Sequence, residues 1–455
     1  MKLKDQSLPT AASKKVITKS GIDWLPSIPT TWLVKQVKHM YSIQLGKMLQ
    51  NSPQSELDVK VPYCKAVHVT WDKVATSDLP EMWANPREIK QYQVEEGDLL
   101  VCEGGEAGRA SVVDSTPSPC IIQNALHRVR GKNGDVRFLK YILYLVSSSG
   151  WFDVLCNKAT IAHFTREKLA ELKIPCPKNI ETQSSIANFL DHKIELIDAL
   201  VAKKERQIEL LNEKRQALIS HAVTKGLNKS VALKMVDFAG LKELPSHWNV
   251  IPLKRIAKIR YGLSQPPGEM VSGVPFIRAT NINRGQITRD GLLLVDPDEV
   301  PINRIVRLKV GNIIVVRSGA YTGDSAVVTE EFADAIAGYD MVVNFKIGEP
   351  SFFSWQFLSP FVLDTQFGIK SMRAAQPHLN AEELGETLLT FPPICEQHAI
   401  ADYIKDLDSN ICTCSQKIQL QIKTLKEYRI SLIAAAVTGK HGMGDIALKE
   451  CNCAI

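Results

Sequence analysis

The chain has 455 residues, enough for two or three domains that each bury a core of their own. Hydrophobic residues make up 45% and charged residues 23% of the sequence, which is typical of a globular protein and excludes a largely disordered one. Lysine and arginine outnumber aspartate and glutamate by 55 to 49, so nucleic-acid binding is permitted but not required. No apolar run approaches the roughly 18 residues that cross a bilayer, and we expect a cytoplasmic protein with no membrane partner.

The first domain is expected to mix strands and helices. Short runs rich in Val and Ile, bounded by Gly and Pro, predict strands at 98–102, 110–114 and 120–123. A helical pattern follows near 138–146. From residue 181 Gly and Pro disappear, and one long helix is predicted up to about residue 226. A polar and basic connection follows this helix.

The second half of the sequence repeats the first. Residues 183–224 and 397–438 share 15 of 42 aligned positions, far above the one in twenty or so that composition alone would give. Weaker matches cover the rest of the copy, with strands expected at 312–317, 325–329 and 341–347 and a helix near 352–363. The period is too long for a solenoid, so we infer the tandem duplication of a whole unit with pseudo-two-fold symmetry.

This duplication predicts an organisation in seven segments. They are an N-terminal extension (1–20), a first domain (21–180), a central helix (181–226), a linker (227–241), a second domain (242–394), a C-terminal helix (395–440) and a tail (441–455).

Both predicted long helices carry a heptad pattern. Apolar residues recur at alternating spacings of three and four, and nine of eleven such positions are apolar in the first helix and eight of eleven in the second. Each pattern spans 36 residues, or about 54 Å. We expect the two helices to pair as an antiparallel coiled coil with the two domains at opposite ends; the alternative is that each helix packs only on its own domain. The apolar seam consists of Leu190, Ile194, Ile197, Val201, Ile208, Leu211, Leu218, Ile404, Ile411, Ile418, Ile422, Leu425 and Leu432.

The sequence lacks the patterns of common catalytic sites. It has no phosphate-binding G-x-x-x-x-G-K-[ST], and the glycine-rich stretches at 104–108 and 319–323 do not have the dinucleotide-binding spacing. No C-x-x-C pair suggests zinc, and no carboxylate cluster recurs in both copies to hold Mg²⁺. We therefore predict a binding protein without catalytic or metal-binding residues. The alternative is a duplicated α/β enzyme or scaffold whose turns bind a small phosphorylated ligand through backbone N–H groups.

Four motifs occur in the same order in both copies and carry a resemblance. They are P-x-x-W at Pro29 and Pro245, G-[DN]-[LI]-[LI]-V at Gly97 and Gly311, [AP]-H-[FL] around His163 and His378, and a long helix ending L-I-x-x-A-V-T. In this order the chain resembles the specificity subunit of type I restriction-modification enzymes over nearly all of residues 20–440. The turn at 103–106, Glu-Gly-Gly-Glu, and the cysteine-bearing tail after Lys440 depart from the family pattern.

The resemblance implies a fold, a set of partners and a role. The fold is mixed α/β (α+β), with two tandem-duplicated target recognition domains separated by two long antiparallel coiled-coil helices. Each domain would read one half of a split site in double-stranded DNA. The helices would dock two DNA adenine methyltransferase subunits, and restriction subunits would complete a cytoplasmic bacterial or archaeal complex. No cofactor is expected in this chain, since S-adenosylmethionine, ATP and Mg²⁺ would bind the partner subunits.

Candidate DNA-binding residues are polar or basic groups at corresponding strand ends and turns of the two copies. Base edges are read by Arg, Lys, Asn and Gln, and a carboxylate can accept a hydrogen bond from cytosine. The candidates pair across the copies as Lys65 with Arg278, His68 with Asn281, Glu103 with Arg317, Arg109 with Tyr321, Lys158 with Arg373, and His163 with His378.

Overall fold

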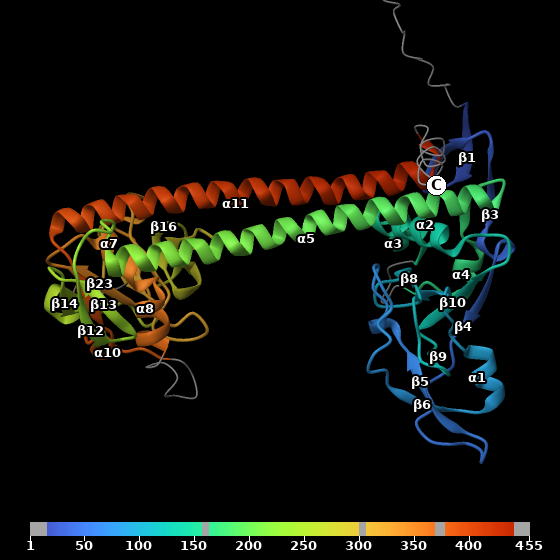
Figure 1. Cartoon of the computed structure of the whole chain (residues 1–455), viewed down its shortest axis with the longest axis horizontal. Coiled ribbons are helices and arrows are strands. Elements are labelled where there is room, and N and C mark those ends of the chain that lie inside the picture. Colours follow the sequence, from blue (N-terminus) through green and yellow to red (C-terminus); the bar gives the residue numbers. More distant parts are fainter. Residues whose placement is uncertain (1–15, 157–162, 300–305, 369–377, 441–455) are drawn as a thin grey trace, which may run out of the picture. The chain divides into compact units, whose positions relative to one another are not determined.

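The computed structural model describes residues 16–156, 163–299, 306–368 and 378–440 (Figure 1). The chain forms two compact units, and neither coincides with one sequence repeat. Unit 1 comprises Met1–Lys203 together with Gln421–Ile455, and unit 2 is the continuous stretch Lys204–Leu420. Each unit therefore contains one domain and a part of both long helices.

The described residues of unit 1 form three small sheets and a hairpin. The hairpin pairs β1 (Ile17–Ile22) with β2 (Leu25–Pro29), and β3 (Trp32–Gln36) pairs with β11 (Lys173–Pro177). A four-stranded sheet has the order β4 (Tyr41–Leu45), β10 (Leu126–Gly131), β7 (Leu99–Cys102) and β8 (Ala110–Val112). A three-stranded sheet has the order β6 (Glu81–Ala84), β5 (Val59–Cys64) and β9 (Ile121–Ile122). The helices of the domain are α1 (Pro86–Tyr92), α2 (Val136–Ser148), α3 (Trp151–Leu155) and α4 (Arg166–Glu171), with 3-10 turns η1 (Val37–His39) and η2 (Ala66–His68).

Unit 2 repeats this arrangement. Its four-stranded sheet has the order β15 (Ala257–Tyr261), β23 (Met341–Phe345), β20 (Ile313–Val315) and β21 (Ser325–Val327). The other pairings are β12 (Leu233–Phe238) with β13 (Leu241–Pro245), β14 (Asn249–Pro252) with β24 (Leu388–Phe391), β16 (Glu269–Ile277) with β19 (Leu293–Val295) and β22 (Ile336–Ala337), and β17 (Ile282–Asn283) with β18 (Gln286–Ile287). The helical segments are α6 (Leu253–Ile256), α7 (Pro350–Phe357), α8 (Pro360–Val362), α10 (Ala381–Gly385), η3 (Ala279–Asn281), η4 (Pro297–Glu299), η5 (Glu330–Phe332) and the π-helical η6 (Leu363–Gly368).

The segment expected to be a linker is partly folded. Within 227–241, residues Leu233–Phe238 form β12, and its hairpin with β13 corresponds to the β1–β2 hairpin of the first copy. Exposed and half-buried side chains alternate along Leu-Lys-Met-Val-Asp-Phe, as in a strand with one face covered. Apolar and polar residues do not alternate in the same way, so the sequence pattern did not predict the strand. The repeating unit therefore begins earlier than expected, and β1 likewise begins inside the expected extension at Ile17.

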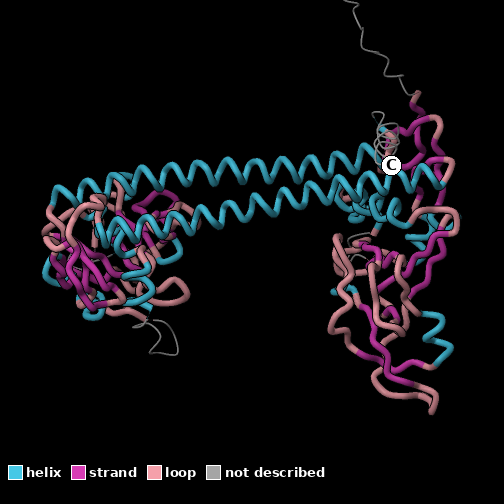
Figure 2. The backbone as a smooth tube through the Cα atoms, viewed as in Figure 1, coloured by secondary structure: helices cyan, strands magenta, loops and turns pink. Residues whose placement is uncertain are grey.

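The two long helices are α5 (Ile180–Lys225) and α11 (Ile394–Val437), and both are unbroken (Figure 2). In the seam that the heptads predict, every residue is buried or half-buried, whereas most of the flanking positions are exposed. Within each unit the two helices run antiparallel, since the end of α5 packs with the start of α11 in unit 2 and Asp198 meets Arg429 in unit 1. The heptad prediction is confirmed for the described residues.

An arginine interrupts each seam at equivalent positions, and both have partners. In unit 2, Arg215 of α5 donates from Nε to Asp408 of α11, and its guanidinium lies 5.9 Å from the ring centroid of Trp355. In unit 1, Arg429 of α11 lies 3.2 Å from the carboxylate of Asp198 and 4.9 Å from the ring centroid of Tyr144. Each arginine thus joins the helix pair to an aromatic side chain of the adjacent domain.

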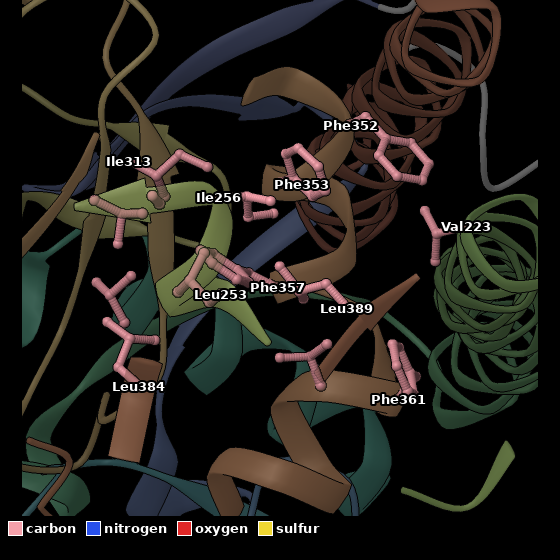
Figure 3. Close-up of a cluster of buried hydrophobic side chains, with 14 of the residues drawn as sticks. Val223, Leu253, Ile256, Ile313, Phe352, Phe353, Phe357, Phe361, Leu384 and Leu389 are labelled. Atoms are coloured by element: carbon pink, nitrogen blue, oxygen red, sulfur yellow. The ribbon is translucent and has the colours of Figure 1, made fainter. Parts of the chain in front are cut away.

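The core of unit 2 contains residues from both repeats (Figure 3). Val223, near the end of α5, packs in one buried cluster with Phe352 of α7 and Leu389 of β24. The hydroxyl of Thr390 donates to the carbonyl oxygen of Val223 at 2.6 Å and so satisfies one of the terminal carbonyls of α5. The alternative in which each helix packs only on its own domain is therefore wrong.

Candidate DNA interface

The glycine-rich stretches are the turns of two equivalent β-hairpins. The first joins β7 to β8 and the second joins β20 to β21. In each, a glycine with positive φ closes the turn: Gly108 N–H donates to Cys102 O at 2.9 Å, and Gly323 N–H donates to Val316 O at 2.8 Å. A strand follows each turn, whereas a dinucleotide site would need a helix whose N-terminus faces the phosphates. Backbone N–H groups in both hairpins, among them those of Arg109 and Thr322, donate to carbonyl oxygens of the hairpins themselves, so the geometry does not support the alternative of a phosphorylated ligand bound by these N–H groups.

The first of these turns gives a stability prediction. A Cβ at Gly108 would lie 2.1 Å from Cζ of the buried Phe152, and the residue has a φ of 81°. Gly108→Ala should lower the free energy of unfolding by about 2 to 4 kcal/mol, because it combines overpacking with backbone strain. Gly105→Ala is the matched control, since Gly105 has a φ of 78° but no atom within 4 Å of its Cβ position. It should cost only about 1 kcal/mol. Denaturant unfolding of the full chain measures both, and equal losses would contradict the steric argument.

Each hairpin is bound by the segment that carries the repeated histidine. The carbonyl oxygen of Glu103 accepts from Phe164 N–H at 2.7 Å, and that of Arg317 accepts from Leu379 N–H at 2.8 Å. Glu103 and Arg317 therefore occupy equivalent places, as the sequence predicted, and His163 and His378 lie beside them. The histidines differ in exposure, because His163 is exposed and His378 is half-buried.

The hairpins also correct one predicted correspondence. Arg109 O accepts from Cys102 N–H, and Asp324 O accepts from Val316 N–H, both at 2.8 Å. Arg109 thus corresponds to Asp324 and not to Tyr321, because the extra residue of the second turn precedes its closing glycine. Tyr321 is the counterpart of Glu106 and is 59% exposed at the tip of its turn.

A second pair of turns, η2 and η3, holds four more candidates. Lys65 and Arg278 precede these turns, and the side chains three residues later fold back onto their N–H groups. His68 Nδ1 accepts from Lys65 N–H at 3.3 Å, and Asn281 Oδ1 accepts from Arg278 N–H at 3.1 Å. Burial, and then the charge of Lys65, lower the pKa of His68. The side chain of His68 therefore stabilises η2, and that of Asn281 stabilises η3.

Asn281 does not face DNA. Its exposed fraction is 0%, and its amide donates to the carbonyl oxygens of Thr288 and Asp290 at 3.4 and 3.0 Å. With its donors and its acceptor all used inside the domain, the prediction that it contacts a base is wrong. Sequence alone could not separate a buried asparagine from one at a base edge, because both are polar residues in a turn.

Arg109 is half-buried and its guanidinium is occupied. Nη1 donates to Glu106 Oε2 at 3.0 Å, and Nη2 donates to the carbonyl oxygen of Ala66 at 3.0 Å. The indole of Trp71 donates to the other oxygen of Glu106 at 2.7 Å. This network ties the first hairpin to η2. Arg278 is occupied in a similar way, since its Nη2 donates to Gly291 O at 2.8 Å.

Glu103 lies next to a buried histidine. Glu103 Oε2 is 4.0 Å from His127 Nε2, which also lies 2.9 Å from Phe164 O. Burial lowers the pKa of His127 despite these acceptors, which favours a neutral ring whose Nε2–H donates to the carbonyl. The carboxylate of Glu103 is partly exposed and can accept a hydrogen bond from outside the domain.

Arg317 has the opposite charge in the equivalent place of unit 2. Its guanidinium carbon lies 4.6 Å from the ring centroid of Tyr261 and 4.3 Å from that of Tyr339. Nη2 lies 3.4 Å from His378 Nε2, and the backbone N–H donates to Asp340 Oδ1 at 3.2 Å. Burial raises the pKa of Asp340 to about 6, against the opposing effects of this hydrogen bond and of the arginine charge. Sequence analysis missed both tyrosines.

Two candidates, Lys158 and Arg373, lie outside the described residues. Among the residues that are described, no group of three or more His, Cys, Asp or Glu side chains could hold a metal ion. Eight cysteines of the described part are free thiols, including Cys64 and Cys120 with sulfur atoms 3.8 Å apart. No helix within the described ranges is long and apolar enough to span a membrane.

Comparison with known proteins gives the same assignment in both halves. The family model "Type I restriction modification DNA specificity domain" matches residues 29–210 and again 245–424. The EcoBI specificity subunit of Escherichia coli is 24% identical, with 94% of this chain and 90% of that protein covered. The MjaVIII specificity subunit of Methanocaldococcus jannaschii is 23% identical, with 91% and 93% covered.

Solved structures share the fold at low sequence identity. A chain from a study of complex assembly and conformational transition of the type I R-M system superposes with a TM-score of 0.70 at 12% identity, covering 91% of this chain and 99% of that one. The HsdS subunit of Thermoanaerobacter tengcongensis gives a TM-score of 0.53 at 12% identity, covering 91% and 98%. The chain therefore belongs to the family of type I restriction-modification specificity subunits, the non-catalytic chains that recognise DNA in these enzymes.

Proposed function

We propose that each domain reads one half of a bipartite DNA target, with recognition domains at about 21–180 and 242–394. One observation carries this proposal: two hairpins of the same topology present opposite charges at equivalent positions, Glu103 in the first and Arg317 in the second. A carboxylate accepts hydrogen bonds from a base edge, whereas a guanidinium donates them. A shared scaffold with different chemistry suits two different half-sites.

The long helices are proposed to dock two DNA adenine methyltransferase subunits and to set the distance between the half-sites. Large apolar side chains outside the seam support docking, since an isolated exposed helix gains nothing from them. They are Leu196, Leu200, Leu210, Tyr403, Leu420 and Tyr428, each more than 40% exposed. In the full complex, restriction subunits would join, and S-adenosylmethionine, ATP and Mg²⁺ would bind the partner chains.

A domain exchange tests the proposal. Residues 245–395 are replaced by the corresponding segment of another specificity subunit, and the chimera is expressed with the methyltransferase subunits. Because the domains have separate cores, we expect the methylated sequence to change completely in one half and not in the other. Sequencing of methylated adenines across a genome provides the measurement.

The reciprocal exchange of the first domain is the matched control and should change the other half alone. Alteration of both halves by either exchange would contradict independent recognition by the two domains. A chimera that assembles with its partners but methylates the original site would show that the exchanged segment does not read DNA.

A further inference from the structure

The backbone of Arg317 is held on both sides. Arg317 follows the end of β20, an inner strand of the four-stranded sheet, and begins the turn toward β21. Its carbonyl oxygen accepts from Leu379 N–H at 2.8 Å, and its N–H donates to the buried Asp340 at 3.2 Å. The side chain therefore starts from a fixed point of the domain.

The guanidinium plane is also fixed. Tyr261 and Tyr339, both 43% exposed, lie at the adjoining ends of the neighbouring strands β15 and β23 and place their rings 4.6 and 4.3 Å from the guanidinium carbon. Tyr261 is itself held, because its hydroxyl accepts from Ala381 N–H at 2.7 Å. Cation–π contact with two rings limits rotation of the arginine. The residue is half-buried, and its Nε–H is buried without a hydrogen-bond partner among the described residues.

Arg317 retains unused hydrogen-bond donors. A guanidinium has five N–H groups, and among the described residues Arg317 uses one of them, toward His378 Nε2 at 3.4 Å. No described carboxylate forms an ion pair with it, whereas Arg109 is paired with Glu106. Arg278 also donates from its guanidinium to one partner, Gly291 O, but among the described residues two aromatic rings lie against Arg317 and none against Arg278. A preorganised arginine with free terminal donors matches the bidentate recognition of guanine O6 and N7 in the major groove.

We propose that Arg317 reads a guanine in the half-site of the second domain, with Tyr261 and Tyr339 as positioning residues. The inference rests on the proposed function, that this domain reads one half-site. It is specific to the second copy: Glu103 replaces the arginine in the first, and Leu45, whose strand β4 pairs with β10 as β15 pairs with β23, takes the place of Tyr261. The first domain cannot use the same contact for guanine.

The test uses the complete chain assembled with its methyltransferase subunits. The wild-type complex first defines the half-site by its methylated adenines, and we expect an essential guanine there. Arg317→Ala should lower the preference for that guanine by about 5- to 150-fold and leave every other position unchanged. Arg317→Lys should also lose this preference while keeping most of the affinity, because lysine keeps the charge but not the fork.

Further variants make the result specific. Tyr261→Leu, which introduces the residue of the first copy, should weaken the same preference in the same direction by a smaller factor. Arg289→Ala is the control, since Arg289 is exposed and paired with Glu331, and it should change nothing. Thermal unfolding and co-purification with the methyltransferase subunits identify variants that fail to fold.

Several outcomes would overturn the inference. One is that the half-site read by the second domain contains no guanine. Another is that the Arg317→Ala complex recognises the same bases as the wild type. A third is an equal loss of affinity for all sequences, which would indicate a phosphate contact. If these occur while the domain exchange still changes one half-site, the assignment of Arg317 is wrong and the proposed function stands. If the exchange leaves the half-site unchanged, the proposed function itself fails.

Discussion

Lengthening both long helices by one heptad is expected to lengthen the preferred DNA spacer by about three base pairs. Seven residues inserted after Lys204 in α5 and another seven after Ile418 in α11 keep the apolar seam in phase and add about 10 Å to the pair. Stacked base pairs are spaced by about 3.4 Å. Both half-site sequences should stay the same, because neither domain is altered.

The measurement is selection of bound duplexes from a library in which the spacer between the half-sites varies. A control variant replaces exposed residues in the same stretches without changing their length, and it should keep the original spacing. Inserting a heptad into one helix alone should disrupt the pairing instead. An unchanged preferred spacer in a folded, lengthened variant would show that the helices do not set the distance between half-sites.

Removing the arginine at the junction of the helices in unit 2 should be strongly destabilising. The side chains of Arg215 and Asp408 are 20% and 21% exposed, so Arg215→Ala leaves a mostly buried carboxylate without its partner and removes the contact with Trp355. We expect a loss of about 2 to 4 kcal/mol in the free energy of unfolding, below the full value for a completely buried pair because some solvent reaches this one.

An exposed pair on the same helix provides the control. Arg206 and Glu209 are 56% and 62% exposed, and Arg206→Ala should cost far less than Arg215→Ala because solvent screens an exposed ion pair. Replacing Arg215 and Asp408 together by leucine should restore most of the lost stability, since a well-packed apolar pair can substitute for a buried ion pair. Denaturant unfolding distinguishes these cases. A loss for Arg215→Ala no larger than that for Arg206→Ala would contradict the argument.

Sequence reasoning succeeded where the signal was periodic. The heptads identified the buried face of both helices because burial imposes a repeat of three and four residues. Two of the polar residues in that pattern, Arg215 and Asp408, form an ion pair. Spacing along the sequence cannot reveal this pairing, because the two residues lie 193 positions apart in the chain. The strand β12 was missed because apolar and polar residues do not alternate along it, although the burial of its side chains does.

The candidate interface was harder to predict. Repetition located the two hairpins and the equivalence of Glu103 with Arg317, but it could not distinguish inward from outward side chains. Asn281 is fully buried, whereas Tyr261 is partly exposed and stacks on Arg317. Comparing the two copies identifies the residues that both share. Tyr261 and Tyr339 occur only in the second copy, so this comparison could not identify them.

The composition of unit 1 affects how the chain can fold as it is synthesised. This unit needs Gln421–Ile455 in addition to Met1–Lys203, whereas unit 2 is continuous in sequence. During translation from the N-terminus, unit 2 therefore has nearly all of its residues before the last part of α11 leaves the ribosome. Until then the apolar face of α5 around Ile194 and Ile197 has no partner helix, although the domain beside it has been complete for more than two hundred residues. The first domain to be made is therefore in the last unit to be completed, and the apolar face of its helix is open to aggregation until the end of α11 has been synthesised.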